Sequence, residues 1–113
     1  MGILSSKRYV EILDKALSKN YKTFIETGTY NGRSIIPLAK EFYDVNFYTI
    51  EIVKELYLFA KNKAEDEGLK NINFYNGDSR DLLKKILNSI DSEHVIIFLD
   101  AHSSSYEGYS AET

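Results

Sequence analysis

The sequence predicts an α/β protein built on a parallel β-sheet with crossover helices, and three observations support this class. Four short apolar runs alternate with segments of helical periodicity along the 113 residues, which is typical of strand–helix–strand units. The length and the 43% hydrophobic content fit a single domain with a substantial core. Each apolar run also ends in, or is soon followed by, an acidic residue. We therefore expect one domain over residues 1–113.

The first half of the chain is predicted to contain a helix, a strand and a second helix. Residues 6–19 carry apolar side chains at helical spacing, behind a serine that can cap the helix. The run KTFIET, residues 22–27, is typical of a short buried strand. The next helix contains Pro37, which is tolerated only in the first turn because proline lacks an N–H group. Ser34 is therefore the predicted N-cap, and residues 28–33 form a loop.

The second half adds three strands, two helices and a terminal loop. The strands are NFYTIE, INFYN and HVIIFLD, at residues 46–51, 72–76 and 94–100. Gly68 ends the first of the two helices, whose predicted inner face is Leu56, Phe59, Ala60 and Ala64. Asp78 or Ser79 caps the second helix. The last strand is apolar throughout, as expected for a strand covered on both faces, and residues 101–113 are predicted to be loop.

Four carboxylates are predicted to lie along one edge of this sheet, and they are Glu26, Glu51, Asp78 and Asp100. In open α/β sheets, ligands bind beyond the carboxyl ends of the strands. Four carboxylates around one cleft suit a cation that also carries hydroxyl and amine groups. S-adenosylmethionine is such a ligand, because it has a sulfonium, an ammonium, an adenine amine and a ribose diol. The loop with Gly28 and Gly32 leaves room for its amino-acid part.

Four motifs in this order resemble those of class I S-adenosylmethionine-dependent methyltransferases. They are ETGTYNG at residues 26–32, YTIE at 48–51, NGDS at 76–79 and FLDAH at 98–102. Within that class, ETGTYNG together with LDAH is similar to small-molecule O-methyltransferases of the macrocin type. The resemblance covers about residues 20–105. It implies a three-layer Rossmann-like fold with strand order 3-2-1-4 and helices on both faces of the sheet.

The resemblance also implies which residues bind the cofactor. Gly28 and Gly32 would shape the pocket for the methionine part together with Glu26, and Glu51 would accept both ribose hydroxyls. Asp78 and Ser79 would contact the adenine. The implied cofactor-binding set is Glu26, Gly28, Thr29, Tyr30, Gly32, Glu51, Ile52, Asp78, Ser79 and Asp100.

Two residues of the last motif are the implied catalytic residues. Asp100 would lie near the transferred methyl group, and in some relatives an acidic residue at this position binds a divalent cation such as Mg²⁺. His102 is a candidate general base for an acceptor hydroxyl, because the ordinary pKa of histidine, about 6.5, is close to working pH. Alignment of donor and acceptor should dominate the catalysis of an in-line methyl transfer.

The same resemblance predicts that the usual C-terminal strands are missing, so that residues 1–113 form a truncated, cofactor-binding half of the domain. The fourth strand would then be an exposed edge, and an exposed apolar edge is a template for pairing with another chain. A homo-oligomer formed through this edge is one consequence.

Composition and charge restrict the partners. The net charge is −3, and the basic residues are spread along the chain, which argues against nucleic acid and favours a small-molecule acceptor. The absence of cysteine excludes disulfides and cysteine-ligated metals. No apolar run reaches the roughly 18–20 residues that span a bilayer, and there is no leader-like N-terminus. We expect a soluble, cytoplasmic protein without a membrane partner.

Two other functions remain open, as do structural explanations for the candidate residues. A nicotinamide-dependent oxidoreductase would require G-x-G-x-x-G, whereas three residues separate Gly28 from Gly32. A non-catalytic, self-associating module would retain the fold without turnover. The two glycines could simply form a tight turn. Glu51 and Asp78 could be helix caps. His102 and the tyrosines 30, 106 and 109 could be ordinary surface residues.

Overall fold

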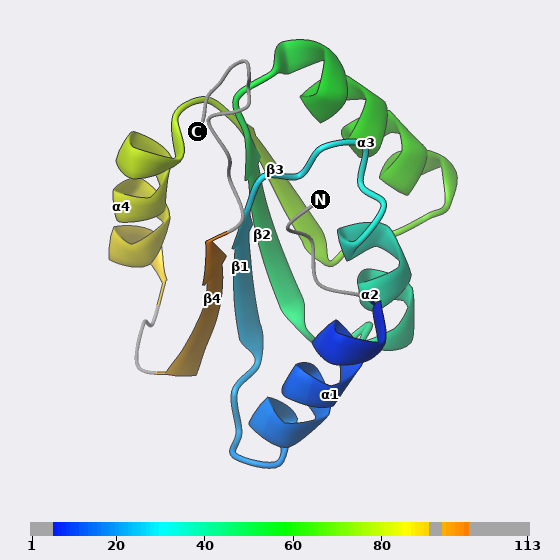
Figure 1. The fold of residues 1–113 in the computed structure, drawn as a ribbon, viewed down its shortest axis with the longest axis vertical. Coiled ribbons are helices and arrows are strands. Elements are labelled where there is room, and N and C mark those ends of the chain that lie inside the picture. Colours follow the sequence, from blue (N-terminus) through cyan, green and yellow to red (C-terminus); the bar gives the residue numbers. More distant parts are fainter. Residues whose placement is uncertain (1–5, 91–93, 100–113) are drawn as a thin grey trace.

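The computed structural model of the protein describes residues 6–90 and 94–99 and contains the predicted parallel sheet. Its strands are β1 (Thr23–Thr27), β2 (Asn46–Glu51), β3 (Ile72–Asn76) and β4 (Val95–Leu99). They form one sheet in the order β3-β2-β1-β4, and each neighbouring pair is parallel (Figure 1). The predicted fold class and strand order are confirmed.

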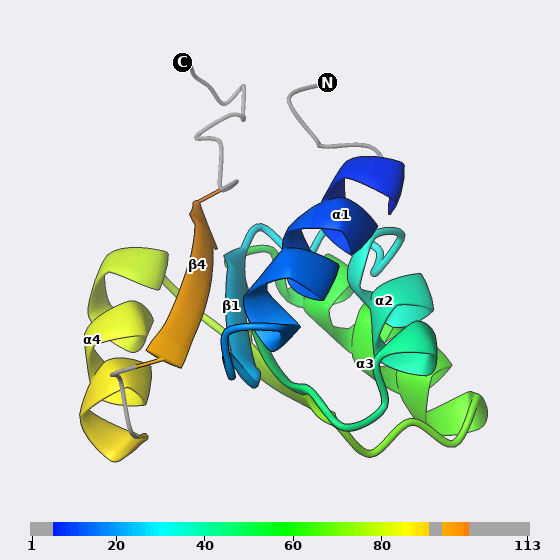
Figure 2. The same cartoon turned by 90° about the horizontal axis from the view of Figure 1, so that it is seen from below.

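Helices cover both faces of the sheet. The described helices are α1 (Ser6–Leu17), α2 (Ile35–Glu41), α3 (Lys54–Asp66) and α4 (Ser79–Ser89). Figure 2 shows α1, α2 and α3 together on one face and α4 on the other, so the molecule has three layers. In the part of the chain that the structure describes, no helix is both long and apolar enough to cross a membrane.

Two hydrophobic cores result from the alternation of side chains along the strands. Phe24 and Phe47 are fully buried against α1, α2 and α3, with their ring centroids 5.3 Å apart. Ile25 and Ile50 point to the opposite face and pack with Ile86 of α4. Full burial of side chains of this size contributes about 1.5–3 kcal/mol each. These residues fix the two central strands between the helix layers.

The edge strand β4 departs from the prediction. Ile96 and Phe98 pack against the core under α1, α2 and α3, but on the other face Ile97 is 39% and Leu99 is 74% exposed. The expectation that this strand is covered on both faces is wrong, because on this face the cluster formed with α4 includes only Val95 of β4, and the described elements leave Ile97 and Leu99 exposed. β4 pairs with β1 alone among the described strands, so its outer edge is open there.

The predicted start of α2 and the predicted end of α3 agree with the structure. Ser34 occupies the N-cap position of α2, although its side chain makes no capping hydrogen bond, and Pro37 lies in the first turn. Gly68 follows α3 with a positive φ of 73°. Within α3, Ala60 and Ala64 are buried as predicted, whereas Phe59 is 54% exposed and does not belong to the inner face.

Candidate functional site

Three of the four predicted carboxylates lie at the carboxyl ends of adjacent strands, at the top of Figure 1. Glu26 is in β1, Glu51 is the last residue of β2, and Asp78 follows β3. The fourth, Asp100, lies outside the described residues, as does His102. The structure therefore brings the first three together at one edge of the sheet, as predicted.

A buried chain of side-chain hydrogen bonds connects β1, β2 and the loop after β1. Glu26, Thr49 and Thr29 are each at most 4% exposed. The Thr49 hydroxyl donates to Glu26 Oε1 at 3.0 Å, and the Thr29 and Thr49 hydroxyl oxygens are 2.6 Å apart. Because Thr49 uses its proton for Glu26, Thr29 donates to Thr49. Buried hydrogen bonds of this kind contribute about 0.5–3 kcal/mol each, with those to a charged group at the upper end.

The backbone of the same loop is also bound to β2. The N–H groups of Gly28 and Thr29 donate to the carbonyl of Ile50, at 2.8 and 3.2 Å. The N–H of Tyr30 donates to Glu51 Oε1 at 2.7 Å, and that of Gly32 donates to the carbonyl of Thr29 at 3.0 Å. These four N–H groups are thus directed into the protein, and the loop is held in shape before any ligand binds.

Both glycines of the loop have a backbone conformation that L-residues rarely adopt. Gly28 has a φ of 88° and Gly32 a φ of 83°. A Cβ at position 32 would lie 2.7 Å from Ile36 Cδ1 and 3.2 Å from Ala60 Cβ. Gly32 is therefore required for packing between α2 and α3, whatever the loop binds. The tight-turn explanation accounts for this glycine but does not exclude a ligand.

Glu51 is a buried carboxylate that is already positioned by the backbone. It is 4% exposed, and in addition to the bond from Tyr30 its Oε2 accepts the N–H of Val53 at 3.0 Å. Its carbonyl accepts from the side chain of Asn76 at 2.8 Å and from the N–H of Gly77 at 3.1 Å. A carboxylate offers about four lone-pair sites, so about two remain for further donors. Val53 is also the N-cap residue of α3, so Glu51 stabilises the start of that helix as well.

Asp78 caps α4 and pairs with Arg80. Its Oδ1 accepts the backbone N–H of Arg80 at 2.8 Å and the Nε–H of the same residue at 3.2 Å, and its Oδ2 accepts from Arg80 Nη2 at 2.8 Å. The side-chain and then the backbone hydrogen bonds from Arg80 lower the pKa of Asp78 below its ordinary value. The capping prediction is confirmed, and the predicted adenine contact stays a prediction.

Replacing Asp78 with alanine should lower the free energy of unfolding by about 1 kcal/mol at neutral pH, as for other lost N-caps. Because the folded pKa is lowered, this contribution is present above the unfolded pKa of about 3.9 and is lost as the pH falls through the folded pKa. Urea denaturation at neutral pH and in acid would measure it. Asp81→Ala, in the same exposed first turn, is the control. Equal losses for both variants would contradict a specific cap.

Two positioning residues were missed by sequence reasoning. Thr49 stands two residues before Glu51 and opposite Glu26 in the strand register, and Asn76 binds the backbone carbonyl of Glu51. The period-two spacing of Thr49 and Glu51 was a signal for a shared face. Of the other predicted residues, Ile52 is 63% exposed beside Glu51, and Ser79 is half-buried as the first residue of α4.

A divalent cation was predicted with Asp100 as its ligand, and that residue lies outside the described residues. Within residues 6–90 and 94–99, no group of three or more acidic, histidine or cysteine side chains is arranged to hold a metal ion.

Residues 20–102 match the profile of a protein family described as "Putative methyltransferase". The chain belongs to this methyltransferase family. The match begins at the loop before β1 and extends past β4, so it includes the edge at which Glu26, Glu51 and Asp78 meet.

The chain is also similar to several curated proteins that are named as methyltransferases. A tRNA (guanine-N(7)-)-methyltransferase of Oceanobacillus iheyensis is 29% identical over 83 residues, which are 74% of this chain and 38% of the relative. One of Clostridioides difficile is 39% identical over 59 residues, 52% of this chain and 28% of the relative. A release factor glutamine methyltransferase of Dictyoglomus turgidum is 33% identical over 82 residues, 67% of this chain and 29% of the relative. The chain spans less than half the length of these relatives.

Solved structures share the fold. The O-methyltransferase TomG from Streptomyces achromogenes, in complex with SAM, superposes with a TM-score of 0.71 over 96% of this chain and 49% of that chain. The SAH-bound Podospora anserina methyltransferase PaMTH1 has a TM-score of 0.69 over 96% of this chain and 46% of that chain. Both are 21% identical, so the likeness shows the fold alone. The narrower resemblance to small-molecule O-methyltransferases is not confirmed, because the curated relatives named above act by their names on tRNA or a release factor.

Proposed function

We propose that this chain forms the cofactor-binding part of an S-adenosylmethionine-dependent methyltransferase. The observation that carries the proposal is the Glu51 carboxylate, which two backbone N–H groups hold at the end of β2. Two hydroxyls of a ribose diol match the acceptor sites that remain on it. Ile52, exposed beside it, offers an apolar surface for the adenine.

The loop after β1 favours S-adenosylmethionine over a dinucleotide. Dinucleotide-binding loops direct free backbone N–H groups and a helix N-terminus at the pyrophosphate. Here the N–H groups of Gly28, Thr29, Tyr30 and Gly32 are all used within the protein. The nearby carboxylates Glu26 and Glu51 would also repel phosphate. An amino acid with an ammonium group and a sulfonium suits this environment, and the sulfonium supplies the methyl group.

The relatives favour a guanine base in RNA as the methyl acceptor. Guanine N7 carries a lone pair and no proton, so its methylation requires no general base. A small molecule with a hydroxyl acceptor is the alternative, supported by the motifs ETGTYNG and LDAH. That reaction requires removal of a proton, and His102 would take this role beside Asp100. Loss of methyl transfer in a His102→Ala variant would therefore favour the hydroxyl acceptor.

The open edge of β4 supports a second candidate, a self-associating module without turnover. Leu99 and Ile97 are exposed next to an edge that lacks a partner strand among the described residues. Such an edge can pair with a second copy of the chain.

Calorimetric titration of the 113-residue chain with S-adenosylhomocysteine, with NAD as the control, tests the proposal. We expect binding at micromolar strength, which corresponds to about −8 kcal/mol, and none for NAD. Light scattering on the same sample would give the molecular mass. A folded dimer that binds neither compound would support the self-associating module, whereas a monomer that binds S-adenosylhomocysteine would exclude it.

A further inference from the structure

The face of the sheet under α1, α2 and α3 changes from apolar to polar toward the carboxyl ends of β1 and β2. The register pairs Phe24 with Phe47 in the apolar part and Glu26 with Thr49 in the polar part. Glu26 is 2% exposed and Thr49 is fully buried, so neither is an ordinary surface side chain. A buried layer of carboxylate and hydroxyl groups therefore borders the edge at which ligands bind in such sheets.

Stability alone does not account for this polar layer. Burying a carboxylate costs free energy, and replacing both partners of a buried hydrogen bond with apolar side chains of the same shape is often neutral or stabilising. The Thr49 hydroxyl also makes two separate contacts. It donates to Glu26 Oε1 at 3.0 Å, and it lies 2.6 Å from the Thr29 hydroxyl, which donates to it. Thr49 therefore connects a carboxylate of β1 with the loop that follows β1.

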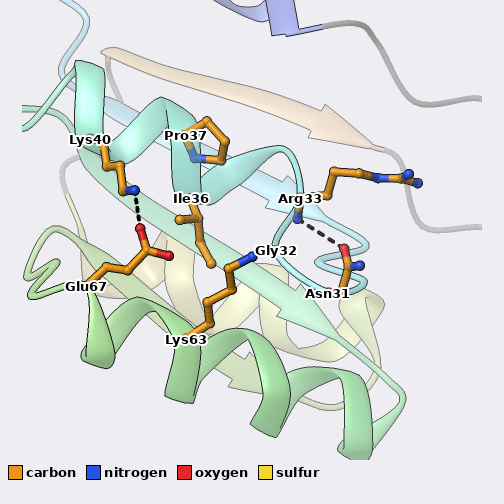
Figure 3. Close-up of a pocket in the computed structure, with 8 residues that line it drawn as sticks. All are labelled: Asn31, Gly32, Arg33, Ile36, Pro37, Lys40, Lys63 and Glu67. Carbon is orange, nitrogen blue, oxygen red and sulfur yellow. Dashed lines mark hydrogen bonds and ion pairs between the residues drawn. The ribbon is translucent and has the colours of Figure 1, made fainter.

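The two ends of this loop are positioned by different groups. At the far end, Gly32 packs so closely beside Ile36 of α2 that no Cβ fits between them (Figure 3). At the near end, the Thr29 side chain is 4% exposed and is bound to the Thr49 hydroxyl. Loss of that hydroxyl would therefore disturb Glu26 and the near end of the loop, and it would leave the far end in place.

Glu51, the carboxylate proposed to bind the ribose, is held by groups other than Thr49. Its two side-chain oxygens accept the backbone N–H groups of Tyr30 and Val53. Its backbone carbonyl accepts from the side chain of Asn76. The edge of the sheet therefore has two separate sets of supports, one for Glu26 and the start of the loop and one for Glu51.

We propose that Thr49 is a positioning residue that sets the affinity for the amino-acid part of the cofactor, acting through Glu26 and Thr29. The inference rests on the proposed binding of S-adenosylmethionine. The hydroxyl stabilises the charged form of the Glu26 carboxylate, which attracts the ammonium group of an amino acid. It also fixes the start of the loop that leaves room for this group. Binding of the ribose and adenine beside Glu51 does not depend on it.

Calorimetric titration with two compounds tests the inference. S-adenosylhomocysteine contains the amino-acid part, whereas methylthioadenosine keeps the ribose and adenine but lacks that part. Thr49→Val keeps the branched shape of the side chain and removes the hydroxyl. We expect this variant to bind S-adenosylhomocysteine about tenfold more weakly, as for the loss of one hydrogen bond to a charged group, and to bind methylthioadenosine with unchanged affinity. Thr49→Ser keeps the hydroxyl and should restore the affinity for S-adenosylhomocysteine, whereas Glu51→Gln should weaken the binding of both compounds.

The outcomes separate this inference from the proposed function. Equal weakening of both compounds by Thr49→Val would overturn the inference, because a purely structural role has no reason to spare methylthioadenosine. Unchanged affinity for S-adenosylhomocysteine in a variant that circular dichroism shows to be folded would also overturn it, while the proposed function stands. No binding of either compound by the unchanged chain would overturn both. If Thr49→Val does not fold, Thr29→Val, which removes only the outer hydroxyl, must show the same selective loss, and its absence decides against the role of Thr49.

Discussion

Replacing Gly32 with alanine should lower the free energy of unfolding by about 3 kcal/mol. A left-handed conformation costs a non-glycine residue about 1–2 kcal/mol, and overpacking a tight site costs about 1–3 kcal/mol. Both apply here, because φ is 83° and the added Cβ would lie 2.7 Å from Ile36 Cδ1. The neighbouring Ala60 Cβ, at 3.2 Å, limits the space into which the loop can retreat. Urea denaturation followed by circular dichroism would measure the loss.

Gly68→Ala is the matched control for this experiment. Gly68 has a similar φ of 73°, but nothing lies within 4 Å of the position its Cβ would take. We expect this variant to lose only the conformational part, about 1 kcal/mol. Equal losses at the two positions would show that the packing of the loop against α2 and α3 contributes nothing. Because the Gly32 variant perturbs the loop itself, weaker cofactor binding by it would not identify a contact with the cofactor.

The fold could be predicted because its elements are encoded by local patterns. The runs NFYTIE and INFYN became β2 and β3 with the predicted bounds, since each is rich in β-branched and aromatic residues. The burial of β4 could not be predicted in the same way. Its apolar sequence indicates a buried strand, but burial depends on elements elsewhere in the chain. On the face to which Ile97 and Leu99 point, α4 packs over the other strands and reaches β4 only at Val95.

The sequence predicted where the carboxylates of the site lie. It did not predict the side chains that bind and position them. Glu51 and Asp78 follow their strands directly, so their position at the edge follows from topology alone. The bond from Thr49 to Glu26 depends on the register between β1 and β2, which no local pattern encodes.

Replacing Glu51 with glutamine should weaken S-adenosylhomocysteine binding by about tenfold to a hundredfold, or about 1.4–2.8 kcal/mol. The amide oxygen can serve only one of the two backbone N–H groups that Glu51 now accepts, those of Tyr30 and Val53. Its NH₂ must then face the other donor, and the charged acceptor for the ribose hydroxyls is lost. Calorimetric titration would measure the affinity, with Glu65→Gln on the exposed face of α3 as the control.

The stability of the ligand-free variant decides between the two roles of Glu51. A residue that only supports the start of α3 would lose stability on substitution, and its remaining folded molecules would bind S-adenosylhomocysteine as tightly as the unchanged chain. A residue that also binds the ribose would lose affinity even where urea denaturation shows the chain to be fully folded. Unchanged affinity for Glu51→Gln would therefore reduce Glu51 to a helix-capping residue. The cofactor proposal would then lose the observation that carries it.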